Sequence, residues 1–460
     1  MFSFLFVAIV IEMKIVIIGG GLGGFAVGIG LLQHGYTDVT VYERDIGMDS
    51  RRQGYGLTIL QGISALKRFH VFEEVHSLDT PSRSHYIFDK YGSMIGFFGT
   101  IFWPEADNQP KAKKKHNLHS ERQELRRILM NRYISLHPLG SDGIQWNHRL
   151  CQIDRALHRV SFTNDYTIAG VDLVIGADGI NGLVRSFKYD PLVDKPLNYL
   201  GMLVVLGITG DIDHFLTKDR VFQTMDGCYR LFAMPFSKSR SEESIMWQLS
   251  FPATQTLATQ LSRDPEMLKQ MLMEKCADWH TPIPEMITKT QLNHLMGIPA
   301  FDRDLIEIPD EDKDGIQIAL IGDAAHPMSP FKGQGANQAL LDAVDLSDII
   351  TQNTSDLHTA MKQYEDRMLK RVHSKVMQSR ERVTSFHRPE VLSTENFSYR
   401  GVDEALMQRL NNLGINATWN DSNISIEQAI SDKLNETSSN RETSKEIFSF
   451  SPLDYQTWKY

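Results

Sequence analysis

Cysteine is scarce in this chain, and its three cysteines lie far apart. Cys151, Cys228 and Cys276 form no CxxC pair within the 460 residues. A disulfide-stapled secreted domain needs closely spaced cysteines, and a structural zinc site needs clustered Cys and His ligands. The sequence therefore argues against both classes of protein, and we expect no metal site. Low cysteine content is typical of a reducing compartment, so we expect the protein to be cytoplasmic.

The apolar N-terminus is too short to cross a membrane. Residues 1–11 read MFSFLFVAIVI, and Glu12 and Lys14 interrupt the run, whereas a bilayer core requires about 20 apolar residues. The segment also lacks the basic region and the cleavage site of a signal peptide. We expect residues 1–12 to be an apolar extension that precedes a strand starting at Met13. The alternatives are a misassigned start, with Met13 as the first residue, and a weak membrane anchor.

Positive charge is in deficit. The chain has 48 Lys and Arg against 57 Asp and Glu, a net charge of −9, and an acidic protein repels nucleic acid and anionic lipid. Neither partner is expected. The 32 glycines and 17 prolines are too few for a collagen-like or low-complexity chain. Since 460 residues exceed what one hydrophobic core usually supports, we expect two lobes.

A βαβ unit is predicted near the start of the chain. Lys14–Ile18 is apolar and rich in isoleucine and valine, the segment GGGLGG follows it, and Phe25–Gln33 is apolar at helical spacing. Val39–Tyr42 then has the pattern of a second buried strand. A glycine-rich turn between a strand and a helix is the arrangement that binds dinucleotide phosphates.

The glycine spacing fits that interpretation. Gly19, Gly21 and Gly24 form GxGxxG, which permits a tight turn, close backbone approach to a pyrophosphate and close packing of helix on strand. Glu43 follows about 20 residues later, where a carboxylate can accept hydrogen bonds from an adenosine ribose. These residues predict NAD or FAD and do not decide between them. The alternative is a glycine-rich turn that binds nothing.

A second glycine-bearing turn occurs far along the chain. Ile318–Asp323 is a buried-strand pattern that ends in a carboxylate, which can hold sugar hydroxyls. The following loop contains Pro330, Gly333 and Gly335 and leads into a helical pattern. N–H groups at a helix N-terminus stabilise negative charge, which a reduced flavin carries at one edge of its ring. The alternative is an ordinary turn with Gly and Pro as punctuation.

Three segments together resemble a known family. GGGLGG, Asp172–Arg185 (DLVIGADGINGLVR) and Ile321–Gln338 (IGDAAHPMSPFKGQGANQ) are similar, in order and spacing, to the three motifs of class A FAD-dependent monooxygenases. This aromatic-hydroxylase family includes p-hydroxybenzoate hydroxylase and the tetracycline-inactivating monooxygenases. The resemblance covers residues 13–387. Any one motif is only suggestive, whereas the three together are specific.

The resemblance implies an α/β fold, with a Rossmann-like FAD-binding domain, an interleaved β-rich substrate domain and C-terminal helices. Several β-rich runs between residues 201 and 252 are consistent with a separate sheet. The expected FAD-binding domain comprises residues 13–75, 105–190 and 300–388, and the expected substrate domain comprises residues 76–104 and 191–299. Residues 389–460 are rich in Asn and Ser, and we expect a polar extension that is loosely docked or disordered.

The resemblance also assigns cofactor contacts. Glu43 would bind the adenosine ribose, Asp323 the ribityl chain, and Arg122 would reach the cofactor from a helix. Asp178 and Gly179 belong to a motif that serves both FAD and NAD(P)H in the family. The complete set of expected FAD contacts is Gly19, Gly21, Leu22, Gly24, Glu43, Arg44, Gly54, Gly56, Arg122, Asp178, Asp323, Pro330, Gly333, Gly335, Ala336 and Asn337.

No second GxGxxG occurs, so no separate nicotinamide-binding domain is expected. The resemblance implies noncovalent FAD, reduced by transiently bound NADPH or NADH, and a flavin C4a-hydroperoxide that oxygenates a small aromatic or polyketide-like molecule with O2. No catalytic side chain is assigned, because the cofactor performs the chemistry. Two alternatives remain, namely a flavin-dependent reductase or cyclase on the same fold, and a noncatalytic FAD-binding paralogue.

Substrate contacts are expected from the β-rich segment. Because alternate strand residues share a face, Arg230, Phe232 and Met234 should lie together, beside Met246 and Gln248 of a neighbouring strand. Arg230 and Gln248 are the candidate substrate ligands, and the alternative for each is an ordinary sheet residue. His326, in the second glycine-bearing turn, is interpreted as part of that turn rather than as a base.

Overall fold

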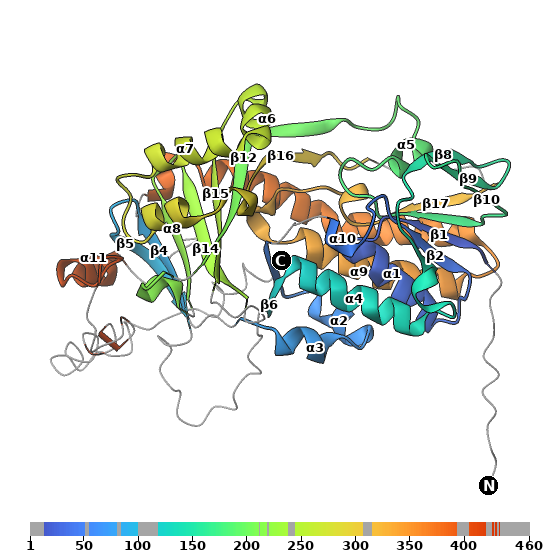
Figure 1. Ribbon diagram of the computed structural model, residues 1–460, viewed down its shortest axis with the longest axis horizontal. Helices are drawn as coiled ribbons and strands as arrows, with labels where there is room; N and C mark the ends of the chain where they lie inside the picture. The colour runs from blue at the N-terminus through green and yellow to red at the C-terminus, as the bar shows by residue number, and fades with distance from the viewer. Residues whose placement is uncertain are drawn as a thin grey trace, which may run out of the picture. The chain divides into compact units, whose positions relative to one another are not determined.

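A computed structural model divides the chain into two compact units built from interleaved segments (Figure 1). Unit 1 contains residues 1–79, 117–200 and 301–380, and unit 2 contains residues 80–116, 201–300 and 381–460. The structure describes residues 13–50, 55–80, 84–99, 118–210, 212–218, 220–237, 244–306, 315–392, 404–419, 426, 428, 429 and 432. The apolar extension 1–12 and Gly54 lie outside the described residues.

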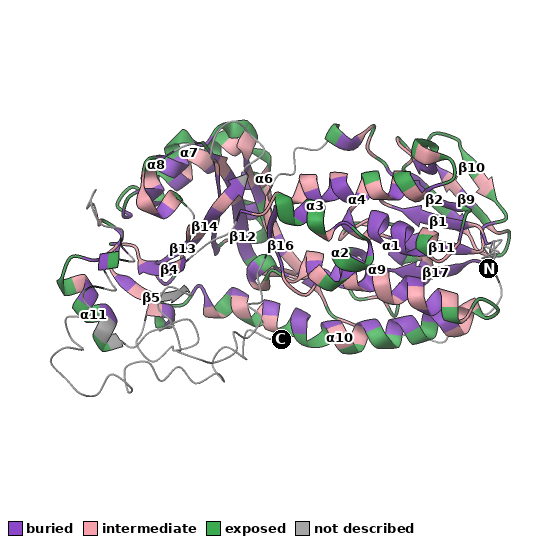
Figure 2. Ribbon diagram, turned by 90° about the horizontal axis from the view of Figure 1, so that it is seen from below, coloured by how far each residue is buried: buried purple, intermediate pink, exposed green. Residues whose placement is uncertain are grey.

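Unit 1 is built on a five-stranded parallel sheet in the order β17-β11-β1-β2-β7. The edge strand β17 and the two interior strands next to it, β11 and β1, are buried along their whole length (Figure 2). Such strands are rich in valine, isoleucine and leucine because helices cover both faces of a parallel sheet. The strands are β1 Ile15–Ile18, β2 Val39–Tyr42, β7 Ile144–Gln145, β11 Leu173–Gly176 and β17 Gln317–Leu320.

Three helices of unit 1 pack together: α1 (Leu22–Gln33), α4 (Arg122–Leu136) and α9 (Gly335–Gln352). Glycines in α1 allow the close approach. A Cβ at Gly28 would lie 2.6 Å from the ring of Tyr133 on α4, and a Cβ at Gly30 would lie 2.5 Å from Ser347 Oγ on α9. Glycine is a poor helix former, so α1 depends on burial between these two neighbours.

The edge strand β17 is closed by side chains from two further helices, α5 (Val184–Lys188) and α10 (Leu357–Ser385). Lys188 Nζ donates to the carbonyl of Ile318 at 2.7 Å, and the hydroxyl of Tyr364 donates to the carbonyl of Leu320 at 2.9 Å. Lys188 also pairs with Glu365 at 2.6 Å, and both side chains are buried. These contacts satisfy carbonyl groups that an edge strand would otherwise leave open.

Smaller elements complete unit 1. A two-stranded sheet and a three-stranded antiparallel sheet lie beside the central one. The remaining elements are β3 Gly56–Ile59, β6 Leu118–Glu121, β8 Leu150–Asp154, β9 Arg159–Phe162, β10 Thr167–Ala169, α2 Ile63–Arg68 and α3 Phe72–Ser77.

Unit 2 contains a seven-stranded sheet in the order β16-β12-β15-β14-β13-β4-β5. The pairs β12–β15, β15–β14, β14–β13 and β4–β5 are antiparallel, whereas β13 and β4 run parallel. The strands are β4 Ser84–Asp89, β5 Met94–Gly99, β12 Leu197–Thr209, β13 Arg220–Met225, β14 Arg230–Ser237, β15 Ser244–Pro252 and β16 Leu295–Arg303.

Apolar and hydrogen-bonded contacts cover one face of this sheet. The indole N–H of Trp247 donates to Thr290 Oγ1 at 3.0 Å, and a Cβ at Gly207 would lie 2.2 Å from the indole ring. Thr224 on the same face hydrogen-bonds His280 at 2.7 Å. The connecting segment folds as α6 Gln255–Arg263, α7 Pro265–Lys275 and α8 Ile283–Lys289. The opposite face carries the residues alternate to Trp247 and Thr224.

Part of the polar C-terminal stretch docks on unit 2. Helix α11, Glu404–Asn412, lies against the edge strand β5. Asn411 Nδ2 donates to the carbonyl of Met94 at 2.9 Å, and its Oδ1 accepts the N–H of Met94 at 2.8 Å. The N–H of Ala417 donates to the carbonyl of Gly92 at 2.9 Å. Residues 404–419 are therefore docked on unit 2 and are not a loosely attached extension. Asn411 bonds both backbone groups of Met94, as a neighbouring strand would.

The predicted α/β class with a Rossmann-like domain is confirmed. The first two strands lie where the sequence places them, and β12, β14 and β15 match the β-rich runs. The parallel pairing of β13 with β4 joins segments more than 130 residues apart in sequence, and no local pattern indicates it. In the part of the chain that the structure describes, no helix has the length and hydropathy to span a bilayer.

Candidate functional site

The turn between β1 and α1 is closed at two of its glycines and open at the third. Gly19 has a φ of +110°, and a Cβ at Gly24 would lie 1.9 Å from the Gly19 carbonyl oxygen. A Cβ at Gly21 would meet nothing within 4 Å. Helix α1 begins at Leu22 with no side-chain cap and no acidic residue in its first turn. Open space at the positive end of a helix suits a pyrophosphate.

Glu43 lies directly behind this turn, after β2. Its side chain is buried, Oε2 accepts the N–H of Gly20 at 2.7 Å and Oε1 accepts the N–H of Asp45 at 3.0 Å. A carboxylate oxygen can accept a second hydrogen bond. Glu43 is therefore fixed in orientation and retains the capacity to accept from a ribose hydroxyl.

Arg126 is a candidate site residue that the sequence analysis does not identify. Its buried guanidinium donates to the carbonyl of Gly20 at 2.6 Å and to the carbonyl of Met48 at 3.3 Å, and it lies 4.0 Å from Glu43 Oε2. It also lies over the ring of Trp146 at 5.8 Å. Arg126 is one helical turn beyond Arg122 on the same face of α4, and that i, i+4 spacing is the signal that could have indicated it.

Asp323 and Arg122 meet at the other end of the site. Asp323 follows β17, is exposed to solvent, and has no hydrogen-bonding partner among the described residues. Surrounding protein nevertheless raises its pKa through desolvation, while the charges of His326 and Arg122 oppose that rise. Arg122 itself begins α4, where its guanidinium lies over the Tyr55 ring at 5.6 Å. An exposed carboxylate without a partner is suited to accept hydroxyl groups.

The loop after Asp323 ends in an uncapped helix. Gly333 has a φ of +59° and α9 begins at Gly335, without a side-chain cap or an acidic residue in its first turn. The N–H groups of Gly335, Ala336 and Asn337 make no hydrogen bond within the described chain. They form a concentration of positive potential at the end of an 18-residue helix. Pro330, earlier in the loop, is exposed.

The side chain of Asn337 is fully occupied by the protein. Its Nδ2 donates to the carbonyls of Thr58 and Gly333, and its Oδ1 accepts the N–H groups of Leu60 and Gly62. Any contact of Asn337 with a cofactor therefore comes from its backbone. The side chain instead ties the loop to β3 and to the residues that follow it. The predicted Gly56 is the first residue of β3.

Asp178 occupies the loop after β11. Its Oδ2 accepts the N–H of Val184 at 3.0 Å, and its Oδ1 is buried without a hydrogen-bond partner. Burial raises the pKa of Asp178, and the charge of Arg44, an exposed residue after β2, partly offsets this. Gly179 has a φ of +82°. Asp178 therefore holds its own loop, and one oxygen remains for a further contact.

A polar strip crosses the second face of the unit 2 sheet. Phe232 lies opposite Gln248 and Met234 lies opposite Met246, so the predicted sharing of one face with Arg230 is confirmed. Arg230 Nε donates to Gln223 Oε1 at 2.8 Å. Gln223 Nε2 lies 2.7 Å from His85 Nε2, and Ser250 Oγ lies 2.8 Å from His387 Nε2. We call this set of five side chains (Arg230, Gln223, His85, Ser250 and His387) the polar strip.

Burial sets the electrostatics of the polar strip. Burial lowers the pKa of Arg230 to about 9, and its guanidinium lies 4.3 Å from the Phe386 ring centre. His387 has its pKa lowered to about 4 by burial, so it is neutral at pH 7. Gln248 is half-buried and makes no side-chain hydrogen bond within the described residues. The same residues contain no group of three or more His, Cys, Asp or Glu arranged to hold a metal ion.

The residues of unit 1 fit FAD. Gly21 leaves open space that suits a pyrophosphate, and Glu43 and Asp323 offer carboxylate oxygens that suit sugar hydroxyls. The uncapped N-terminus of α9 offers N–H groups that suit an anionic flavin edge. A family model described as FAD binding domain matches residues 12–379. The chain belongs to the class A FAD-dependent monooxygenases. FAD is thus its cofactor, as the three motifs predicted.

Individual relatives agree with the family. The FAD-dependent urate hydroxylase of Klebsiella pneumoniae subsp. pneumoniae is 26% identical over 406 residues, which cover 87% of this chain and 97% of the relative. The 3-amino-4-hydroxybenzoate 2-monooxygenase of Streptomyces cremeus is 30% identical over 234 residues, 50% of this chain and 54% of the relative. The two relatives are thus named for different substrates, urate and 3-amino-4-hydroxybenzoate.

A solved structure agrees in fold. Klebsiella pneumoniae HpxO, complexed with FAD and uric acid, superposes with a TM-score of 0.66 at 21% identity, covering 92% of this chain and 96% of that one. At this identity the likeness establishes the shared fold alone. The roles of individual site residues in this monooxygenase therefore rest on its own geometry.

Substitution of Arg126 by methionine should weaken FAD binding about tenfold or more. The change removes the hydrogen bonds that fix the Gly20 and Met48 carbonyls and the charge beside Glu43. Titration of the apoprotein with FAD, followed by flavin fluorescence, measures the effect. Arg127→Met is the matched control, since Arg127 is more exposed and pairs with Asp49 on the surface. Equal affinities for the two variants would exclude the assigned role of Arg126.

Proposed function

We propose that this monooxygenase hydroxylates a small planar aromatic or heteroaromatic compound, with NADPH or NADH as electron donor and O2 as the source of the oxygen atom. The observation that supports this best is the mixed face of unit 2, where the polar strip adjoins buried apolar side chains. Met234, Met246 and Val204 are buried on that face, and Phe232 is half-buried between Arg230 and Met234. A planar ring with a few polar substituents matches such a surface.

Unit 1 binds and orients the cofactor. Glu43 accepts from the adenosine ribose, the α1 N-terminus holds the pyrophosphate, Asp323 accepts from the ribityl chain, and the N–H groups at the start of α9 stabilise negative charge on the flavin. FAD, when bound, supplies the redox chemistry that links nicotinamide oxidation to oxygen transfer. No second GxGxxG occurs in this sequence, and the exposed Arg44 and the loop of Asp178 are the proposed sites of transient NAD(P)H contact.

Unit 2 binds and orients the substrate. Arg230, whose pKa of about 9 leaves it charged at pH 7, supplies a positive potential for a carbonyl, phenolate or carboxylate oxygen. Gln248 supplies a donor and an acceptor for a ring nitrogen or hydroxyl. The methionines contact the ring and exclude water, which would otherwise divert the reaction into side reactions. The named substrates of the relatives, urate and 3-amino-4-hydroxybenzoate, have this combination of planarity and polar edges.

Replacement of Arg230 by methionine should lower kcat/KM for the substrate about tenfold or more and leave FAD affinity unchanged. A hydrogen bond to a charged group contributes about 1.5–3 kcal/mol, and Arg230 belongs to unit 2, not to the cofactor unit. Steady-state kinetics and FAD titration separate the two effects. Arg220→Met is the control, because Arg220 donates to the carbonyls of Phe215 and Lys218 in a turn. A parallel loss of FAD would contradict a substrate role.

Labelled oxygen tests the reaction itself. The holoenzyme is incubated with NADPH or NADH, ¹⁸O2 and a panel containing urate, aminohydroxybenzoates, other phenols and polyketide phenols. The proposal expects at least one compound to accelerate nicotinamide oxidation and to gain one ¹⁸O atom. Nicotinamide oxidation with an altered product that lacks ¹⁸O would instead indicate a reductase or cyclase. Bound FAD that neither nicotinamide reduces would indicate a noncatalytic paralogue.

A further inference from the structure

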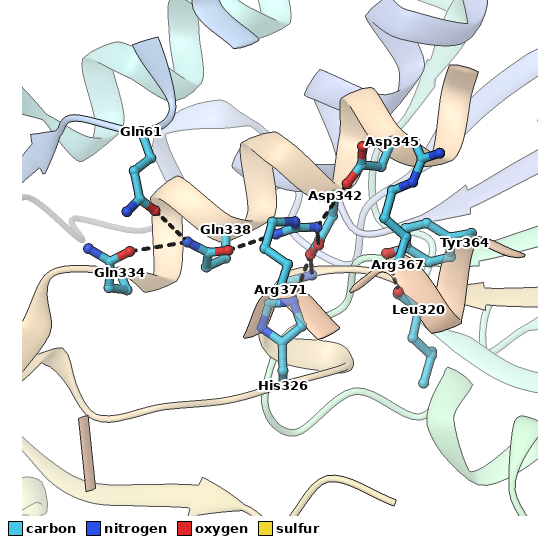
Figure 3. A network of polar contacts seen from close by, with 11 residues as sticks. Gln61, Leu320, His326, Gln334, Gln338, Asp342, Asp345, Tyr364, Arg367 and Arg371 are labelled. Atoms are coloured by element: carbon cyan, nitrogen blue, oxygen red, sulfur yellow. Dashed lines mark hydrogen bonds and ion pairs between the residues drawn. The ribbon is translucent and has the colours of Figure 1, made fainter. Parts of the chain in front are cut away.

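A buried polar network lies behind the loop that joins β17 to α9 (Figure 3). At its centre is Asp342 on α9, which is fully buried. Its Oδ2 accepts the N–H of Gly322 at 2.8 Å and lies 2.8 Å from Nε2 of the buried His326. Both partners belong to the beginning of the loop, on either side of Asp323. Asp342 therefore fixes the segment that presents the ribityl acceptor.

A single side chain links this centre to a second branch. Arg371 on α10 donates from Nη2 to Asp342 Oδ1 at 2.7 Å and from Nη1 to Gln338 Oε1 at 2.7 Å. Gln338 Nε2 lies 2.8 Å from Gln61 Oε1 and 3.1 Å from Gln334 Oε1. Figure 3 shows the guanidinium between the two branches. Gln334 is the residue immediately before α9, so the second branch holds the end of the loop.

The carboxylate of Asp342 has a cationic partner within the network, Arg371. Burial alone would raise the pKa of Asp342, but the charges and hydrogen bonds of His326 and Arg371 bring it below its ordinary value. The carboxylate is therefore ionised at neutral pH, and it needs its cation. Tyr364, about two turns before Arg371 on α10, is held separately, because its hydroxyl donates to the carbonyl of Leu320. Loss of the guanidinium would leave Asp342 with fewer partners and Gln338 without its orienting donor.

We propose that Arg371 is a positioning residue of the FAD site. Arg371 acts on the FAD site through Asp342 and Gln338, and it makes no hydrogen bond to an expected FAD contact among the described residues. One guanidinium holds both ends of the loop Gly322–Gln334, and with them Asp323 and the uncapped start of α9. The proposal rests on FAD binding alone and is independent of the substrate and of oxygenase turnover.

The neighbouring arginine of α10 provides a matched control. Arg367 is more exposed than Arg371, with 55% of its side chain accessible against 20%, and it lies 3.5 Å from Asp345. Arg371 also approaches Asp345, at 3.3 Å, so both arginines share this surface contact. Only Arg371 bonds Asp342 and Gln338. Arg367→Met therefore removes a comparable side chain and leaves the network intact.

The experiment compares Arg371→Met, Arg371→Lys and Arg367→Met as full-length proteins. FAD affinity is measured by titration of each apoprotein, the midpoint potential of the bound flavin by dye equilibration, and loop opening by hydrogen exchange. For Arg371→Met we expect affinity about tenfold or more below wild type, faster exchange in residues 322–334 than in β1 and α1, and a lower potential. A lysine can reach one branch at a time, so Arg371→Lys should be intermediate, and Arg367→Met should match wild type.

A second variant keeps the test decisive if Arg371→Met does not fold. Gln338→Leu removes the branch to Gln334 and Gln61, and Asp342 keeps both His326 and Arg371. It should lower FAD affinity and speed exchange near Gln334. The proposal is overturned if either folded variant binds FAD with the affinity and potential of Arg367→Met. A wild-type protein that binds no FAD would instead contradict the assignment of FAD to unit 1. The failure of the Arg371 proposal and the failure of the proposed function are therefore distinguishable.

Discussion

Substitution of Gly21 by alanine leaves the fold intact and removes FAD binding. A Cβ at this position meets no protein atom within 4 Å, and the residue has an extended backbone with φ of −87°. Alanine is therefore tolerated by the apoprotein, but its methyl group occupies the space through which the turn must approach the pyrophosphate. We expect an unchanged thermal midpoint of the apoprotein and an FAD affinity reduced about a hundredfold or more.

Gly24→Ala supplies the contrast. Its Cβ would lie 1.9 Å from the carbonyl oxygen of Gly19, so α1 and the turn must move apart. Overpacking of this kind costs about 1–3 kcal/mol or more, and FAD binding should be lost together with stability. Differential scanning calorimetry of the two apoproteins, followed by FAD titration, separates the effects. If Gly21→Ala bound FAD normally, the pyrophosphate would not lie at this turn.

Acidification from pH 6.5 towards pH 4 destabilises unit 2 steeply. Burial lowers the pKa of His214, His280 and His387 to about 4 in each case. In the unfolded chain these groups take up protons near pH 6.5. Between pH 6.5 and pH 4 the unfolded state binds protons that the folded state does not bind. The contribution of these histidines to the free energy of unfolding is therefore fully present above pH 6.5 and is lost as pH falls from 6.5 to about 4. Near pH 5 the slope is about 4 kcal/mol per pH unit for three histidines.

Hydrogen exchange of β12–β15 between pH 7 and pH 4.5, corrected for intrinsic rates, measures this loss. His280→Asn should reduce the slope by about one third, because His280 is one of the three buried bases. Strand β1 of unit 1 serves as an internal reference, since the contribution of Asp342 is lost only between the ordinary carboxyl pKa of about 3.9 and its lowered folded-state pKa, which is below the range measured. A stability of unit 2 that stays constant down to pH 5 would show that these histidines are already charged in the folded protein.

The fold class of the cofactor half and the identity of the cofactor were predictable because their signals are local. Gly19, Gly21, Gly24 and Glu43 lie within 25 residues, and their spacing follows directly from the geometry of a βαβ unit. The place of Asp323 after a buried strand was predictable for the same reason, whereas its contact with FAD stays a prediction. The structure adds the detail that Asp323 is exposed and has no hydrogen-bonding partner in the described chain.

The supporting residues were not predictable, because their partners are distant in sequence. Arg126 holds a carbonyl 106 residues away, and Arg371 meets Asp342 from another helix. The i, i+4 spacing places Arg126 on the same face of α4 as Arg122, but the orientation of that face against the glycine turn comes only from the fold. The same holds for Asn337, whose side chain supports the loop after β3 while only its backbone remains for the cofactor.

Unit 2 shows a similar division. The alternation along β14 and β15 predicted which residues share a face, and the register confirms it. The partners of Arg230 come from β13 and from the end of α10, which no short window of sequence connects. The docking of residues 404–419 was equally hidden, since its main contact is a single asparagine that bonds both backbone groups of Met94.

The visible absorption spectrum of the purified protein tests the central claim most directly. It is recorded first as isolated, then anaerobically after addition of NADPH or NADH, and finally after admission of air. We predict bands of bound flavin that bleach with the nicotinamide and return with oxygen. A colourless protein that fails to take up added FAD would contradict the assignment of the glycine turn, Glu43 and Asp323 to this cofactor, and with it the proposed function.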